Sequence, residues 1–347
     1  GGAMKQIHDY IRSQLAAVIA IDSPSGCTNE VQQYIAGQLT DMGFAPQQLA
    51  KGGIRVTLGG EGNPLTLTAH ADTLGAFVRC IKPNGRLAIS NMNLNSFNVE
   101  AENVRVITRF NGVYEGTLQM VNASVHVNPE PRQERDMDKN MEIVLDQDVR
   151  TKEDVQALGI RPGDVIAAEP RFRITDTGYV KSRFLDDKAS VSVLLGLAKW
   201  VSETKPVLNR RLDLLFTVFE EIGHGGACGI APDTVELIAV DMGCVGDTLE
   251  CTERQVSICA KDASGPYNRQ VTDRLIQCAE KAGVDYAVDI YHRYSSDASA
   301  ALRAGYDVRH GLIGPGVYAS HGYERTHLDG IYNTFALLRA YLEESEA

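Results

Sequence analysis

The sequence lacks an apolar run that approaches the ~18 residues needed to cross a membrane. Its start also lacks the basic stretch and apolar core of a secretory signal. Basic residues are not in excess, since the formal net charge is -11, and no block of like charge is long enough to indicate a disordered tail. These absences predict a cytoplasmic protein that binds neither membranes nor nucleic acid.

Cysteine is present without a pattern. The seven cysteines are odd in number and include no CxxC pair, so the sequence indicates neither a disulfide framework nor a thiolate zinc site. The length of 347 residues exceeds that of a typical single domain. We therefore expect one large domain and a smaller one.

The most informative stretch is RLDLLFTVFEEIGHGG, at 211–226. Branched and aromatic side chains at 212–219 predict a buried strand that ends at Glu220 and Glu221. Neighbouring residues on an extended chain point in opposite directions, so the two carboxylates are expected to have separate tasks. One could bind a cation while the other moves a proton. The alternative for such a pair is a solvated turn.

Other acidic and histidine residues also follow predicted strands or precede a helix. The strand TLTAHAD, at 66–72, ends in His70 and Asp72, which share one face of an extended segment. The alternative for His70 alone is a surface histidine. Asp186 and Asp187 precede an apolar helix, where capping and the helix dipole also favour acids. A further buried strand, at 235–243, carries Asp241 near its end.

The predicted secondary structure differs between parts of the remaining chain. Helical spacing is found at 4–20 and 28–42 and again in the closing segment, 331–344. From 74 to 178 short strand-like runs alternate with turn signals, which predicts an all-β insert.

Taken together, these positions offer nitrogen and oxygen ligands without a thiolate. Such a set suits two metal ions that share one bridging carboxylate, Asp186. It favours zinc, cobalt or manganese over calcium or magnesium. The predicted ligands are His70, Asp186, Glu221, Asp241 and His321.

The chain resembles the M42 family of dinuclear metallo-aminopeptidases, which includes glutamyl aminopeptidase and the TET peptidases. The resemblance spans nearly the whole chain and rests on SPSGCTNEV, TAHAD, GIRPGD, FLDD, TVFEEIG, AVDMG, SSDASAALRAG and the late HGYE. It implies a three-layer α/β/α catalytic domain of the zinc-peptidase type at 4–73 and 179–347. It also implies a β-rich insert at 74–178, a barrel or PDZ-like domain that joins dimers into a larger homo-oligomer such as a dodecamer.

The resemblance further implies a role for each site residue. His70, Asp186 and Asp241 would hold one divalent ion, and Asp186, Glu221 and His321 the other. Glu220 would be the general base and Asp72 would orient His70, while Asp187 is expected to cap the helix. Each subunit would carry two ions, zinc or cobalt, with manganese as a further choice.

The implied activity is removal of the N-terminal residue from short peptides that have a free amine, by a water that bridges the metals. A dinuclear hydrolase of small amides or acylated dipeptides is the alternative. A glycosidase also uses paired carboxylates but has no use for two histidines, and a non-catalytic assembly protein would not need the ligand set. The run at 318–324 and the stretch at 90–112 depart from the family's pattern, so side-chain preference does not transfer.

Overall fold

The computed structural model describes residues 1–343, and residues 344–347, where the expected closing helix and catalytic domain end, lie outside that range. The chain divides into two compact units. The larger contains Gly1–Thr73, Phe172–Ser320 and the chain from Glu324 onward, and the inserted unit contains Leu74–Arg171 together with His321–Tyr323. In the described part of the chain, helices long and apolar enough to span a bilayer are absent.

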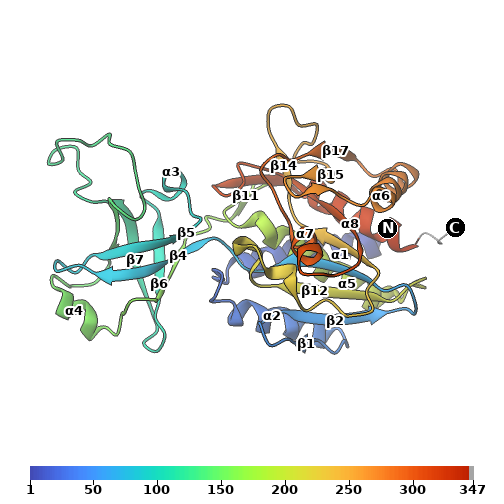
Figure 1. Ribbon diagram of the computed structural model, residues 1–347, viewed down its shortest axis with the longest axis horizontal. Coiled ribbons are helices and arrows are strands. Elements are labelled where there is room, and N and C mark those ends of the chain that lie inside the picture. The colour runs from blue at the N-terminus through green and yellow to red at the C-terminus, as the bar shows by residue number, and fades with distance from the viewer. Residues whose placement is uncertain (344–347) are drawn as a thin grey trace. The chain divides into compact units, whose positions relative to one another are not determined.

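The larger unit is built on one mixed sheet, which has thirteen strands within residues 1–343 (Figure 1). Its main path runs in the order β1 (Gln47–Gln48), β2 (Ile54–Gly59), β12 (Leu212–Thr217), β3 (Leu65–His70), β13 (Glu236–Val240), β18 (Arg309–Tyr318), β19 (Glu324–His327), β11 (Tyr179–Ser182) and β10 (Arg173–Ile174). Beside this path lie β14 (Gly243–Val245), β15 (Val256–Asp262), β16 (Gly265–Pro266) and β17 (Tyr286–Ile290).

The centre of this sheet is parallel. Strands β12, β3, β13 and β18 pair side by side in the same direction. Each of these strands is almost entirely buried, as the continuous apolar runs of the sequence predict. Because parallel strands end at the same edge, their carboxyl ends bring distant parts of the sequence together there.

Alternate residues of the central strands face two separate cores. In β12, Leu214 and Phe216 belong to a core formed with helices α1 (Gly2–Ile19), α2 (Asn29–Asp41), α5 (Leu185–Thr204), α6 (Arg269–Ala282) and α8 (Leu328–Glu343). Leu215 instead belongs to a second core that includes Ala298 and Ala301 of α7 (Asp297–Arg303). Since successive side chains of a strand point to opposite faces, the sheet lies between two helical layers. The expected three-layer fold is confirmed.

Close packing of α1 on α5 fixes the first layer. Ile7, Ile11 and Leu15 lie on the buried stripe of α1, as their spacing predicts. On α5, a Cβ atom added to Gly196 would come within 2.3 Å of Ile11 Cγ1. The glycine therefore allows the two helices to approach each other closely.

The inserted unit is a closed antiparallel barrel (Figure 1). The barrel order is β4 (Gly75–Ile81), β5 (Leu87–Met92), β8 (Met141–Leu145), β7 (Val113–Met120), β6 (Asn103–Ile107) and β9 (Val165–Ala168), with short helices α3 (Ser96–Val99) and α4 (Lys152–Ala157). Of the two expected forms of the insert, it is the barrel. The unit ends at Arg171 rather than at residue 178, because β10 and β11 pair within the large sheet.

Candidate metal centre

The carboxyl ends of three neighbouring parallel strands converge on one place in the larger unit. Strand β3 ends at His70, which lies beside Thr217, the last residue of β12. On the other side of β3, strand β13 leads directly into Asp241. Helix α5 brings Asp186 and Asp187 to the same place at its start.

The centre of the site is the His70 imidazole, which is 1% exposed. Oxygens of four carboxylates lie within 3.7 Å of its Nε2 atom. The distances are 2.9 Å to Asp186 Oδ1, 3.2 Å to Glu220 Oε2, 3.5 Å to Asp241 Oδ2 and 3.7 Å to Glu221 Oε1. The structure therefore brings together four of the five predicted metal ligands and the predicted base.

Asp72 fixes the other side of the imidazole. His70 Nδ1 lies 2.9 Å from the Asp72 backbone oxygen and 3.4 Å from its Oδ1 atom. A proton on Nδ1 would be donated to these oxygens, which leaves Nε2 as the free ligand atom. The backbone carbonyl of Asp72 thus orients the ring at closer range than the expected carboxylate.

The expected geometry of Glu220 and Glu221 is wrong in one respect. Strand β12 ends at Thr217, and the pair lies on a 3-10 helix, η1 (Glu220–Ile222). On this tight turn both carboxylates approach the same imidazole nitrogen, whereas an extended strand would send them apart. The two carboxylates therefore do not point in opposite directions, so a difference between their tasks must have another cause.

Asp187 has a different position from the one expected. The start of α5 has no side-chain cap, and Asp187 Oδ2 accepts a hydrogen bond from the His70 backbone N–H at 3.0 Å. Its carboxylate also belongs to a group with His70 and Asp241 whose possible ligand atoms lie within 4.8 Å of one another. This contact could not be predicted from the spacing of residues, because an acid at a helix start is ordinarily a cap.

Burial and neighbouring charges shift the pKa of several groups in the cluster. Burial raises the pKa of Glu220 and of Asp241 well above the ordinary value, and neighbouring carboxylates raise it further. Burial alone would lower the pKa of His70, but the charges of Glu220 and Asp241 and hydrogen bonds to Asp186 and Asp72 raise it well above its usual range. Burial is the largest cause of the raised pKa values of Glu220 and Asp241, and repulsion between the carboxylates adds to it.

The donor set fits a metal ion. Five carboxylates lie around the His70 imidazole. Burial of that much like charge is costly without a compensating cation, and imidazole with carboxylate oxygens is a typical zinc, cobalt or manganese environment. The groups that could hold an ion include His70 with Glu220 and Glu221.

Two further histidines, His321 and His224, are relevant to the predicted set of metal ligands. His321 lies in the segment His321–Tyr323 of the inserted unit, so its role as a metal ligand stays a prediction. His224 follows the acidic turn but stacks on Phe219, and its Nδ1 atom lies 3.2 Å from Lys51 Nζ. It stays outside the ligand set.

Three polar residues that support the site had no role assigned to them from the sequence. The Ser25 hydroxyl donates to Asp72, and Glu324 Oε1 accepts the Asp186 backbone N–H at 3.0 Å. Asp297 Oδ2 accepts the Thr217 hydroxyl at 2.5 Å. All three lie in stretches that carry the family resemblance, SPSG, HGYE and SSDASAALRAG, which is the signal that could have found them.

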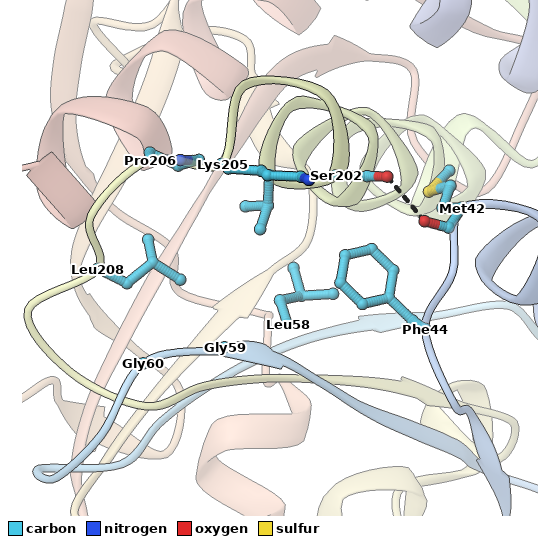
Figure 2. A pocket seen from close by; sticks show the side chains of 10 residues that line it. Met42, Phe44, Leu58, Gly59, Gly60, Ser202, Lys205, Pro206 and Leu208 are labelled. Carbon is cyan, nitrogen blue, oxygen red and sulfur yellow. Dashed lines mark hydrogen bonds between the residues drawn. The ribbon is translucent and has the colours of Figure 1, made fainter.

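A separate pocket of about 380 Å³ lies at the C-terminal ends of α2 and α5 (Figure 2). Its walls are mostly apolar, and Lys205 is the only ionisable residue among the ten that line it. The Ser202 hydroxyl at its edge is already used, since it donates to the Met42 carbonyl at 2.7 Å. This pocket shares no residue with the acidic cluster.

A three-layer α/β/α unit with acids and a histidine at its strand ends, interrupted by a β-barrel, is an arrangement typical of metal-dependent peptidases. The sequence profile of the M42 glutamyl aminopeptidase family matches residues 52–337. The chain therefore belongs to the M42 peptidase family and is a hydrolase that acts on peptide bonds.

Its relatives include a Bacillus subtilis protein provisionally named aminopeptidase YhfE, which is 44% identical over 329 residues and covers 94% of this chain and 95% of that protein. The TET1 peptidase of Pyrococcus horikoshii shares the fold, with a TM-score of 0.86 and 21% identity over 96% of this chain and all of that one. The aminopeptidase APDkam598 of Desulfurococcus kamchatkensis matches with a TM-score of 0.85 and 20% identity, over 99% of this chain and 96% of that one.

Metal ions should stabilise the protein more as the pH rises. The pKa values of Glu220, Asp241 and His70 are raised in the folded, metal-free chain, so that chain binds more protons than the unfolded one and loses stability as the pH rises. A divalent ion replaces those protons. We expect the Tm difference between cobalt-loaded and chelator-treated protein to grow from pH 5.5 to pH 8, measured by scanning calorimetry. A Tm difference that shrinks from pH 5.5 to pH 8 would contradict the replacement of protons by metal ions.

Proposed function

We propose that the chain is a metal-dependent aminopeptidase that removes the N-terminal residue of short peptides. The observation that carries this proposal is the convergence of four carboxylates within 3.7 Å of one buried imidazole nitrogen, at the ends of parallel strands. The names of the relatives, aminopeptidase and peptidase, favour the same activity.

In this proposal two divalent ions, zinc or cobalt with manganese as a further choice, occupy the cluster. Asp186 would be a ligand of both ions, because its Oδ1 atom lies 2.9 Å from His70 Nε2 and its carboxylate also belongs to a group with Glu221 that could hold an ion. His70 and Asp241 would complete one ligand set, and Glu221 and His321 would complete the other. When bound, such ions lower the pKa of a water molecule and polarise the scissile carbonyl group.

Glu220 would move the proton. Its side chain is 12% exposed against 4% for Glu221, so a water or a leaving amine reaches Glu220 more easily. Burial raises its pKa, and a carboxylate whose pKa lies nearer to neutrality takes and returns a proton more efficiently. Glu220 would accept the proton of the attacking water at a carboxylate oxygen and pass it to the leaving amine.

The remaining residues hold these groups in place. The Asp72 carbonyl keeps the proton of His70 on Nδ1, and Glu324 holds the backbone of Asp186. The free amine of a peptide carries a lone pair or a positive charge that the ions and acids of the site can bind. This recognition favours an exopeptidase over an endopeptidase.

The inserted unit offers a surface for self-association. Its large apolar side chains Phe97 and Phe110 are 81% and 78% exposed, and Val113, Val125 and Val127 are also exposed. Isolated apolar residues are common on surfaces, but several on one small barrel favour an interface. Since the TET1 peptidase assembles into a tetrahedron or an octahedral shell, we infer that this chain forms a homo-oligomer.

Separate substitutions of Glu220 and Glu221 test which residue is the base and which is a metal ligand. Glu220→Gln should retain metal while turnover falls by a factor on the order of 10² or more, because an amide cannot take the proton. Glu221→Gln should lose metal instead. Elemental analysis together with turnover checks both expectations. Equal metal content in the two variants would show that the roles are assigned wrongly.

Substrates with and without a free amine test the aminopeptidase assignment. Free dipeptides and aminoacyl amides should be cleaved with cobalt or zinc present, and their N-acetylated forms should not, because an acylated nitrogen is a poor ligand and carries no charge. Product release measured by chromatography for a matched panel distinguishes them. Faster cleavage of the acetylated panel would favour the acyl-dipeptide hydrolase.

Assembly can be measured directly. Light scattering of the metal-loaded protein should give a mass several times the 37.8 kDa of one chain. Replacement of Phe97 and Phe110 by Ser should reduce that mass, because both lie exposed on the inserted unit. A monomer across a wide concentration range before any substitution would defeat the inference.

A further inference from the structure

The loop at 23–26, with the sequence SPSG, has no task in the function proposed so far. It runs alongside the chain that follows β3. The Ser25 N–H donates to the Thr73 carbonyl at 3.1 Å, and the Thr73 N–H donates to the Ser23 carbonyl at 2.9 Å. A parallel bridge joins Pro24 to Thr73. The loop is therefore attached by its backbone to Thr73, and the Ser23 hydroxyl donates to the carbonyl of Ala71, on the other side of Asp72, at 2.7 Å.

From this fixed backbone the Ser25 hydroxyl donates to Asp72 Oδ2. Ser25 is 2% exposed and Asp72 is fully buried, so solvent has no access to replace this donor. A hydrogen bond to a buried carboxylate is worth more than one between neutral groups, and its loss leaves the charge undersolvated. The hydroxyl therefore holds the Asp72 carboxylate in one rotation.

The Asp72 carboxylate in turn holds the acidic turn. Its Oδ1 atom accepts the Glu220 backbone N–H at 3.2 Å, and its Oδ2 atom accepts the Glu221 backbone N–H at 3.2 Å. Both residues of η1 that face His70 are thus attached to one carboxylate. A rotation of that carboxylate would break both attachments.

We infer that Ser25 is a positioning residue, which fixes the Asp72 carboxylate and through it the turn that carries Glu220 and Glu221. The inference rests on the proposed function, because it assigns Ser25 to the proposed base and metal ligand. It also gives the SPSG loop a task in the site. Ser25 contacts neither substrate nor metal in this scheme.

The test compares Ser25→Ala with a matched loss of a buried hydroxyl elsewhere. Ser192 is fully buried, and its hydroxyl donates to the Ala189 carbonyl within α5 at 2.6 Å, away from the acidic turn. Ser192→Ala therefore makes the same chemical change without touching Asp72. A general effect of losing one buried hydroxyl would appear in both variants.

Ser25→Ala should lower kcat about tenfold with KM changed less than about twofold, because one charge-assisted hydrogen bond is lost. Titration of the metal-free protein with cobalt should show affinity at the weaker site reduced about three- to tenfold, since Glu221 moves with the turn. Ser192→Ala should change neither quantity. Ser25→Thr keeps a hydroxyl donor, so it should retain both the kcat and the cobalt affinity of the unaltered protein. It also keeps the inference testable if Ser25→Ala fails to fold.

The Asp72→Asn background shows whether Ser25 acts through Asp72. Adding Ser25→Ala there should change cobalt affinity and kcat no further, because coupled residues are not additive. Fully additive losses, or equal losses in Ser25→Ala and Ser192→Ala, would overturn the inference. Cobalt affinity is measured without substrate, so absence of peptidase activity would refute the proposed function while Ser25 is still tested.

Discussion

The interaction on which the rest of the site depends is the mutual repulsion of buried carboxylates around one imidazole. Asp186, Glu220, Glu221 and Asp241 all approach His70 Nε2, although each would be better solvated in water. The protein tolerates this because three strand ends and one helix start meet at a single edge of a rigid sheet. Such a cluster reaches its lowest free energy when a cation replaces the protons it would otherwise hold.

Rigid packing holds the acidic turn from two sides. On one side, Asp72 accepts the backbone N–H groups of Glu220 and Glu221. On the other side, Asp297 fills the space beside the next turn, where a Cβ atom on Gly225 would lie 2.5 Å from its Oδ1 atom. A Cβ atom on Gly226 would lie 2.0 Å from the Asp297 carbonyl oxygen, so the two glycines at 225 and 226 reflect the packing of α7 against the site.

Much of this arrangement could be predicted because it follows from local patterns. Buried strands have long apolar runs, and parallel strands end at one edge, so His70 and Asp241 were expected to meet. The 3-10 turn at Glu220 could not be predicted in this way, because it depends on hydrogen bonds to Asp72, which lies 148 residues away in the sequence. The place of Asp187 in the site could not be predicted for a related reason. Its partner, the His70 backbone, is visible only in the folded chain.

The difference between the proposed ligands and the proposed base follows from how each side chain is held. His70 and Asp241 are attached to strands of a sheet buried on both faces, which fixes their positions as metal ligands must be fixed. Glu220 lies instead on a short turn, at a more exposed position than Glu221. A group that takes a proton from water and delivers it to a leaving amine must reach two positions in one cycle. A turn that is anchored through its backbone, and whose acidic side chain is partly exposed, meets both requirements.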